Sequence, residues 1–421
     1  MFLNKLIKKG GIVIKKLLLL LFIFLMFDNY QVYASDNTQA RIGNNYFGSL
    51  EEAIEFSDEN DIISLTTDIM VDESLQINKN VNINLNNHNI KAKEKVFLID
   101  GGSLNLSGTG KIYEEKPNYG AIILVGSDNP DDKNYSTVNI GSGIFLEGWS
   151  GIFIKQKNKT GYGITINMNG RINAVDDLNN DSGVGIYVNG QISNEENYPV
   201  INLSDTVSIS SSGVGIYAAG YAEYNINGAY ISGFESSLGI KSGIFNINNG
   251  TFIGSGTDKT PTTGNNNGIN ASGTAMQIES NSKYKGDVEI NIKNGTFKSK
   301  NSHVIYEYIA DNTTTKVKSI NISNGKFISE NNKTVFLLSD SFINKYKAFI
   351  SGGKYSSEPS DYLKEGYKVN KNNDLYEIIN NEISVFAFKD MTSNNYVVPI
   401  LFICFIIIFY FVYKSYIKKP H

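Results

Sequence analysis

EINIKNGTF (residues 289–297) returns thirty residues later as SINISNGKF (319–327). The shared phrase is a short alternation of Ile and Asn, then Gly, any residue and an aromatic residue. Four further copies are VNIGSGIF (138–145), YNINGAY (224–230), FNINNGTF (245–252) and AFISGGKY (348–355). From Gly228 onwards, the glycines of successive copies lie 22, 45, 30 and 28 residues apart. A fixed phrase at an irregular spacing predicts stacked β-units joined by loops of variable length.

A second phrase runs out of step with the first. DSGVGIYVNG (181–190) and SSGVGIYAAG (211–220) are nearly identical, and SGIFIK (150–155) and LGIKSG (238–243) are weaker copies. Each unit is therefore expected to carry at least two distinct strands. Alternation along a strand predicts inward side chains at Val184, Ile186, Val188, Val214 and Ile216, and outward ones at Tyr187 and Tyr217.

The fold expected from these repeats is all-β: one single-stranded, right-handed parallel β-helix over residues 61–378. Its strands are short and end in Asn, Gly, Ser or Asp, which suits a chain that turns repeatedly. Ten or eleven coils, stacked about 4.8 Å apart, would make a rod on the order of 50 Å long. Asparagines at the corners are expected to form side-chain ladders between coils. Core filling is predicted for the aromatic residues Phe252, Phe297, Phe327 and Tyr355.

The N-terminal end of the rod is expected to be capped within residues 35–60. Residues 49–58 predict a short helix, because Ser49 and Glu52 form a capping box and Leu50, Ala53 and Ile54 share one face. Such a helix would cover the exposed end of the core.

Both ends of the chain carry apolar runs. Residues 1–34 predict a signal peptide cleaved after Ala34, with five lysines before an apolar stretch. Residues 379–395 are interpreted as a stalk and residues 396–413 as a transmembrane helix. Lysines follow in the tail, 414–421, and place it in the cytoplasm, with the preceding part of the chain outside the cell.

Charge and cysteine content restrict the partners and the means of stabilisation. The formal charge is −4; the leader contributes +4 and the tail +3, which leaves −11 for residues 35–413. An acidic exported region argues against nucleic acid and anionic lipid as partners. The single cysteine, Cys404, lies inside the predicted span, so a disulfide within the exported region is excluded.

Two segments bracket the predicted rod and carry a family resemblance. The run from ARIGNNYF to LNNHNI (40–90) resembles the opening of pectin-lyase-like β-helix surface proteins of Gram-positive bacteria. SGGKYSSEPSDYLKEGYKVNKNNDLYEI (351–378) is similar to the segment that closes the β-helix in such proteins. The resemblance implies an architecture and a cell-surface setting, but no activity. No LPxTG-like motif precedes Val397, which favours retention in the membrane over covalent attachment to the wall.

Candidates for catalysis are few. Enzymes of the broad fold that the resemblance implies need a basic residue among carboxylates, and Arg171 is followed by Asp176 and Asp177. The alternative for Arg171 is a salt bridge at the rim without function. His88 is interpreted as a turn residue, because a lone histidine lacks the partners of a catalytic base, and His303, before VIYEY, has no better claim to catalysis.

A calcium site is a further candidate. Asp177, Asn179 and Asp181 fall at alternate positions, so their oxygens could converge on Ca²⁺. Ser182 and Val188 stand where a calcium loop has Gly and Glu, and the alternative is a solvated loop. DNPDD (128–132) is a weaker candidate of the same kind.

Contacts with a ligand are predicted along one outward strip. Phe153, Tyr187, Tyr217 and Lys241 occupy matching places in the second phrase, and Trp149 lies beside Phe153. Such a strip could stack on sugar rings or bury against a protein, and the alternative is that the rings stack on one another under loops.

Three functions remain open from the sequence. The leading hypothesis is a membrane-anchored surface protein that binds an extracellular glycan or protein. The second is a polysaccharide lyase or glycoside hydrolase around Arg171, Asp176 and Asp177, and the third is a spacer without a ligand.

Overall fold

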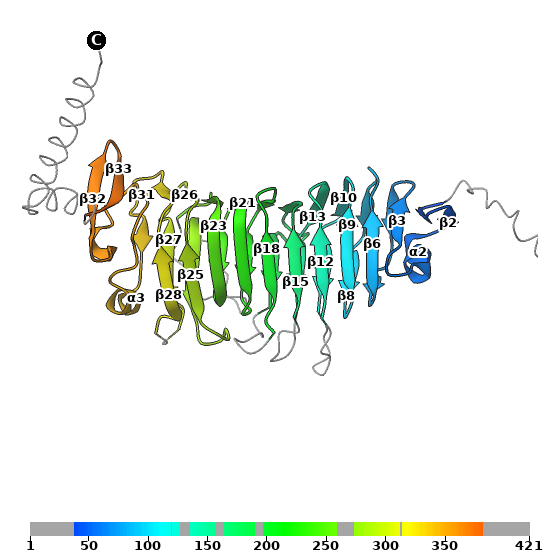
Figure 1. Cartoon of the computed structure of the whole chain (residues 1–421), viewed down its shortest axis with the longest axis horizontal. Coiled ribbons are helices and arrows are strands. Elements are labelled where there is room, and N and C mark those ends of the chain that lie inside the picture. Colours follow the sequence, from blue (N-terminus) through cyan, green and yellow to red (C-terminus); the bar gives the residue numbers. More distant parts are fainter. Residues whose placement is uncertain are drawn as a thin grey trace, which may run out of the picture.

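The computed structural model describes residues 38–381, except for 119, 127–134, 156–162, 190–196, 259–272 and 312–313. The described chain is an elongated stack of parallel strands with a cap at each end (Figure 1). Each complete coil contributes three strands, except for two coils in which β21 (Glu223–Gly233) or β23 (Gly243–Gly254) replaces the first two, and strands at the same place in successive coils pair in parallel. Ten complete coils run from β3 to β30, and β31 belongs to the next. The all-β parallel solenoid is therefore confirmed, whereas its right hand stays a prediction.

The three stacks of strands are called the first, second and third face. The first face contains β3 (Ile62–Leu65), β6 (Asn80–Asn84), β9 (Ser103–Ser107), β12 (Thr137–Ile140), β15 (Thr165–Met168), β18 (Val200–Leu203), the starts of β21 (Glu223–Gly233) and β23 (Gly243–Gly254), β25 (Val288–Ile292) and β28 (Val317–Ile322). The second face contains β4 (Ile69–Val71), β7 (Ile90–Ala92), β10 (Gly110–Glu114), β13 (Ile144–Gly148), β16 (Arg171–Ala174), β19 (Ser208–Ser211), the ends of β21 and β23, β26 (Thr296–Ser299), β29 (Lys326–Ser329) and β31 (Lys354–Tyr355).

The third face is a separate sheet. It contains β5 (Leu75–Ile77), β8 (Phe97–Ile99), β11 (Ile123–Val125), β14 (Ser150–Ile154), β17 (Val184–Val188), β20 (Val214–Ala218), β22 (Ser236–Ile240), β24 (Thr274–Ser280), β27 (Ile305–Ile309) and β30 (Phe336–Leu337). The first and second faces join into one sheet because β21 and β23 run through both without a break.

The Gly-x-aromatic phrase turns the chain from the first face to the second. Gly295 and Gly325 have φ of +135° and +129°, where a side chain would be strained. A Cβ on Gly325 would lie 3.0 Å from the carbonyl oxygen of Gly295 and 3.1 Å from the Phe327 ring. Glycine is therefore required because each corner packs directly on the one below.

The predicted inner aromatic residues do fill the core. The Phe252, Phe297, Phe327 and Tyr355 rings stack in sequence, with centroids 4.6, 4.9 and 4.9 Å apart. All four are fully buried. This stack fills the interior of the solenoid from one coil to the next. The apolar side of the parallel sheet is therefore covered without a further layer of helices or strands.

One prediction of alternation is wrong. Val184 and Val214 do not join the main core but pack with Trp149 in a second cluster on the outer side of the third face. The residues after them, Gly185 and Gly215, lie so close to core isoleucines that a Cβ would approach within 2.4 and 2.5 Å. The two glycines take the inward place and shift the alternation by one residue.

The N-terminal cap begins with a hairpin that the sequence did not predict. β1 (Ala40–Ile42) pairs antiparallel with β2 (Asn45–Phe47) and with β3, and so covers the first strand. The predicted helix is confirmed as α2 (Leu50–Phe56), with Ser49 accepting from the Glu52 amide and Leu50, Ala53 and Ile54 buried.

The C-terminal end differs from the predicted range 61–378. The parallel coil ends at Tyr355, and the short helices α3 (Asp340–Lys345) and η1 (Ser360–Tyr362) lie on either side of that strand in the chain. β32 (Tyr367–Asn372) and β33 (Leu375–Asn380) form an antiparallel hairpin, and β33 pairs antiparallel with β31. An antiparallel strand closes the edge that another parallel coil would leave open.

The predicted ends of the chain are largely outside the described residues. The signal peptide (1–34), the span (396–413) and the tail (414–421) remain predictions. The predicted stalk, 379–395, begins too early, because Ile379 and Asn380 belong to β33. Among the described residues, no helix is both long enough and apolar enough to span a bilayer.

Candidate binding face

The first face carries one asparagine at the same outward position in nine successive coils. Strand register places each asparagine directly beside the next. This asparagine row consists of Asn82, Asn105, Asn139, Asn167, Asn202, Asn225, Asn246, Asn291 and Asn321. The predicted ladder is thus present, mostly in the middle of the strands, and at one corner Asn248 Nδ2 donates to Asn227 Oδ1 at 2.6 Å.

The amides of the asparagine row are hydrogen-bonded to one another along the whole rod. Each Nδ2 donates to the Oδ1 of the preceding asparagine, at 2.7 to 3.5 Å for the bonds of ordinary length, and Asn139 bonds Asn105 in the same way. At the N-terminal end Asn82 donates to the backbone carbonyl of Asp61. At the other end Lys364 donates to Asn321 Oδ1 at 3.0 Å.

These bonds leave hydrogen-bonding capacity for a ligand. A primary amide has two N–H donors and two acceptor sites on oxygen. For Asn139, Asn167 and Asn202 the ladder uses one donor and one acceptor. The side chains are half-buried. The row therefore offers ordered N–H and C=O groups at the spacing of the coils, about 4.8 Å.

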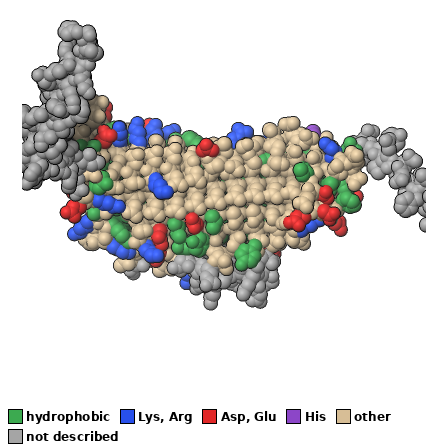
Figure 2. Space-filling view, viewed as in Figure 1, with side chains coloured by type: hydrophobic (Ala, Val, Ile, Leu, Met, Phe, Trp, Pro, Cys, Tyr) green, Lys and Arg blue, Asp and Glu red, His purple; other side chains and the backbone are tan. Residues whose placement is uncertain are grey.

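The surroundings of the asparagine row are uncharged over half its length. From β6 through β18, every outward side chain of the first face is Asn, Ser or Thr, apart from Val200. Figure 2 shows this broad face almost free of Lys, Arg, Asp and Glu. Charges begin again at Glu223 in β21. The face is therefore polar without an electrostatic preference.

Two shallow hollows lie on this face. One, of about 570 Å³, is lined by Asn82, Asn105, Asn139 and their hydroxyl neighbours, with Glu59 at its rim. The other, of about 380 Å³, is lined by Asn167 and Asn202 among other residues, and Asp205 contributes one carboxylate to it. Both are open, so they suit a chain lying on the surface better than an enclosed small molecule.

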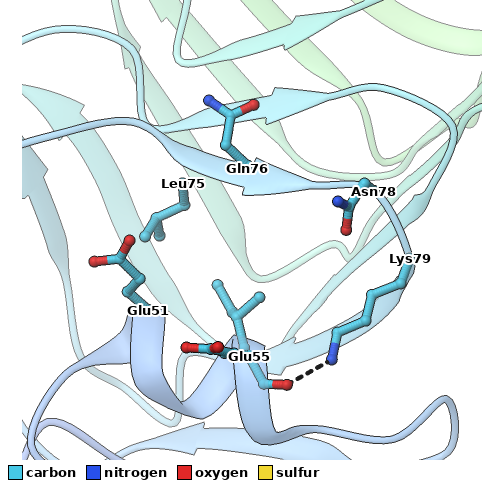
Figure 3. A pocket seen from close by; sticks show the side chains of 7 residues that line it. Glu51, Glu55, Leu75, Gln76, Asn78 and Lys79 are labelled. Atoms are coloured by element: carbon cyan, nitrogen blue, oxygen red, sulfur yellow. Dashed lines mark hydrogen bonds between the residues drawn. The ribbon is translucent and has the colours of Figure 1, made fainter.

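A third hollow, of about 340 Å³, lies where the cap helix meets the first coil (Figure 3). Lys79 spans this seam, and its Nζ donates to the backbone carbonyls of Glu55 at 3.0 Å and Ser57 at 2.6 Å. These carbonyls belong to the last turn of α2 and the residue after it, where helical partners are missing. The lysine therefore fastens the cap to the coil.

The predicted strip of contact residues is buried in part, since Trp149 and Tyr217 are buried and Phe153 and Tyr187 are half-buried. Phe153, Tyr187 and Tyr217 do stand in register on the third face. Phe153 stacks on Tyr187 at 4.4 Å, and Tyr217 meets Tyr187 edge-on at 5.1 Å. Trp149 and Tyr217 are each only 3% exposed. The four residues, called the aromatic flank below, pack on one another, as the alternative interpretation stated.

Lys241 does not belong to the register of that strip. Gly239 is the residue opposite Tyr217, and Lys241 lies two residues further on. Its side chain is 1% exposed and forms an ion pair with Glu279. Burial lowers the pKa of Lys241, and the neighbouring carboxylates oppose this effect.

Arg171 is not brought together with the aspartates that follow it. It stands at the start of β16, whereas Asp176 and Asp177 lie beyond the end of that strand, on the order of 15 Å along it. The Arg171 guanidinium instead lies 5.1 Å from the centroid of the Phe145 ring. The arrangement predicted for a lyase or hydrolase is therefore not assembled from these residues.

The candidate calcium ligands form a self-contained loop. Asp177 Oδ1 accepts from the backbone amides of Asn179 and Asp181, both at 2.8 Å, and Asp177 is 6% exposed. Its oxygens are thus directed at the loop's own N–H groups. Within the part of the chain that the structure describes, no three His, Cys, Asp or Glu side chains are grouped to hold a metal. DNPDD (128–132) lies outside the described residues.

His88 closes a turn, as predicted, whereas His303 lies in the segment just before β27. The His88 amide donates to the Leu85 carbonyl, and its Nδ1 lies 3.4 Å from Asp68. Hydrogen bonds from Asn89 lower the pKa of the Asp68 carboxyl. His303 Nδ1 lies 2.8 Å from the Thr334 carbonyl oxygen.

Sequence reasoning missed the asparagine row as a site, although its signal was present. Every copy of the first phrase except AFISGGKY contains an Asn between two apolar residues, and it was interpreted as part of a structural motif. No family model, no curated protein and no solved structure matches this chain.

Proposed function

We propose that this chain is a cell-surface β-helical rod that binds a neutral polysaccharide along its first face. The observation that carries the proposal is the asparagine row, a continuous line of amides flanked by hydroxyl groups without charge from β6 to β18. Polysaccharides present hydroxyl and acetamido groups at regular intervals, and these pair with amides and hydroxyls. The predicted signal peptide and C-terminal span support the surface setting.

Two further features support an uncharged ligand. Residues 35–413 carry a net charge of −11, which repels polyanionic sugars. The open hollows at Asn105 and Asn167 lie on the same face, so one extended chain would cross both. The lyase or hydrolase hypothesis has less support, because Arg171 begins β16 and Asp176 and Asp177 lie beyond the end of that strand.

Co-sedimentation of the detergent-solubilised full chain with insoluble cellulose and chitin tests this proposal, with heparin beads as the polyanion. Thr165→Lys puts a long cation on the first face beside the asparagine row. Ser208→Lys is the matched control on the second face. We expect Thr165→Lys to weaken binding to a neutral polymer about tenfold or more, which is about 1.4 kcal/mol, and Ser208→Lys to bind as wild type.

Three outcomes would reject the proposal. Equal binding by both variants would move the site away from the first face. Binding to heparin alone would reject the neutral ligand. Retention by none of a broad panel of neutral polysaccharides would favour the spacer hypothesis.

A further inference from the structure

The third face holds a buried lysine and glutamate in direct register. β22 and β24 pair with Ile240 opposite Ile278, so the next residues, Lys241 and Glu279, lie side by side on adjacent coils. Each is 1% exposed, and Lys241 Nζ contacts Glu279 Oε2. The pairing of β22 with β24 is enough to place the two side chains together.

The second oxygen of Glu279 and the surrounding rings complete the arrangement. Asn281 Nδ2 donates to Glu279 Oε1 at 2.9 Å. Lys241 Nζ lies 4.9 Å from the centroid of the Tyr217 ring and 5.4 Å from that of Tyr284. The amine is therefore held against one oxygen of the Glu279 carboxylate, and the other oxygen accepts a hydrogen bond from Asn281.

We propose that Lys241 and Glu279 condense to an amide bond that joins these two coils covalently. A proton passes from the Lys241 ammonium to Glu279 Oε2, which gives a neutral amine and a neutral acid. Nζ then attacks Cδ, and the charge that develops on Oε1 is stabilised by the Asn281 N–H group. The Cδ–Oε2 bond breaks, and Oε2 leaves as water with its own proton and a second one from nitrogen.

Burial favours this reaction in two ways. Taking two charges out of water costs several kcal/mol for each ion, and a neutral amide no longer bears that cost. Because the amine and the carboxyl group are held in contact, the reaction needs no bimolecular encounter. This removes a large part of the activation barrier to amide formation. The lowered pKa of Lys241 acts in the same direction, because it makes the neutral amine more accessible. The same exclusion of water slows hydrolysis of the product.

Peptide mapping of the full chain tests the cross-link directly. Trypsin cuts after lysine and arginine, and the sequence predicts the separate peptides 172–241, 242–259 and 260–283. With the amide in place, cleavage after Lys241 fails. We then expect one branched product that joins 172–259 to 260–283 and is lighter than its parts by one water. Recovery of the three linear peptides in full would overturn the proposal.

Variants separate the proposed chemistry from a simple ion pair. Lys241→Met and Glu279→Ala each remove one reacting group, and the branched product should vanish in both, whether or not the variant is less stable. Lys316→Met is the matched control, because Lys316 donates to the Tyr284 carbonyl and touches no reacting atom. It should retain the branched product. Asn281→Ala should slow its accumulation after synthesis, and an unchanged rate would remove Asn281 from the mechanism.

Discussion

The asparagine row and the aromatic flank both arise because equivalent residues of successive coils stack in register, but their side chains end in different environments. In both, register places one outward residue of each coil beside its counterpart in the next. On the first face that residue is asparagine nine times, and the row is uncharged and half-buried, apart from the exposed Asn321. On the third face it changes from Phe153 to Tyr187, Tyr217 and then Gly239, and the rings pack with Trp149 into a second apolar cluster. Stacking thus fixes where a row lies, and side-chain chemistry decides whether it becomes surface or core.

The largest effect on stability is expected from replacing the tryptophan of the aromatic flank. Trp149→Ala should lower the free energy of unfolding by about 3–5 kcal/mol, because a buried indole leaves a cavity. Thr137→Ala, on the first face, should change it by less than about 0.5 kcal/mol. Urea unfolding followed by circular dichroism measures both. If both substitutions changed the free energy of unfolding by the same small amount, the aromatic flank would again be interpreted as a free contact surface.

The second-largest effect expected is a pH dependence of stability. It arises from a carboxyl group beside the aromatic flank and has no counterpart in the asparagine row. Glu114 is 5% exposed, and its Oε2 accepts from the Trp149 amide at 3.1 Å. Burial raises the pKa of the Glu114 carboxyl to about 7, against an ordinary value of 4.5, although hydrogen bonds partly oppose this. Gly148 makes room for it, since a Cβ there would lie 2.8 Å from Oε2.

The sign of this pH dependence follows from proton binding. Between pH 4.5 and pH 7 the folded state holds a proton that the unfolded state has lost, so stability falls as pH rises through this window. The contribution lost is about 3 kcal/mol at most. Urea unfolding at pH 4.5, 6 and 8 should show this loss in wild type relative to Glu114→Gln. Parallel pH profiles of the two proteins would contradict it.

The smallest effect expected is a charge inserted into the asparagine row. Asn167→Asp replaces the Nδ2 donor with an oxygen that faces Asn139 Oδ1, and a lost buried hydrogen bond costs about 1–2 kcal/mol. The loss should shrink at low pH, where a protonated Asp donates again. Asn169→Asp, on the same face but outside the row, is the control with the same charge. Thermal unfolding of both variants at pH 4 and pH 7 tests this, and equal shifts would show that the ladder contributes nothing specific.

Much of the fold was predictable because the repeats are short-range signals. The inner stack of Phe297, Phe327 and Tyr355 follows from spacing alone, and the helix at Leu50–Phe56 follows from its capping box. Alternation failed at Val184 and Val214, because the glycine after each valine lets the backbone approach a core isoleucine. That approach depends on the neighbouring coil and has no signature within a single strand.

The sequence placed the candidate contact residues on the third face, whereas the binding face that we propose is the first. Aromatic residues such as Trp149 and Tyr217 suggested a contact surface from their chemistry, and the fold buries them. Lys241 was assigned to the same strip by likeness of phrase, but Gly239 holds that place in the register, and Lys241 meets Glu279 instead. Residue type alone does not tell whether an outward side chain meets solvent.

By itself, the sequence determined the coil, its corners and its inner aromatic stack, because these depend on residues within one repeat and its copies. The tertiary structure alone decided that nine asparagines align into one hydrogen-bonded row, that Trp149 and Tyr217 of the aromatic flank are buried, and that Lys241 touches Glu279. The physical reason is that lateral neighbours in a solenoid lie one coil apart in the chain. Loops of unequal length set that separation, so only the stacked strands show which residues meet.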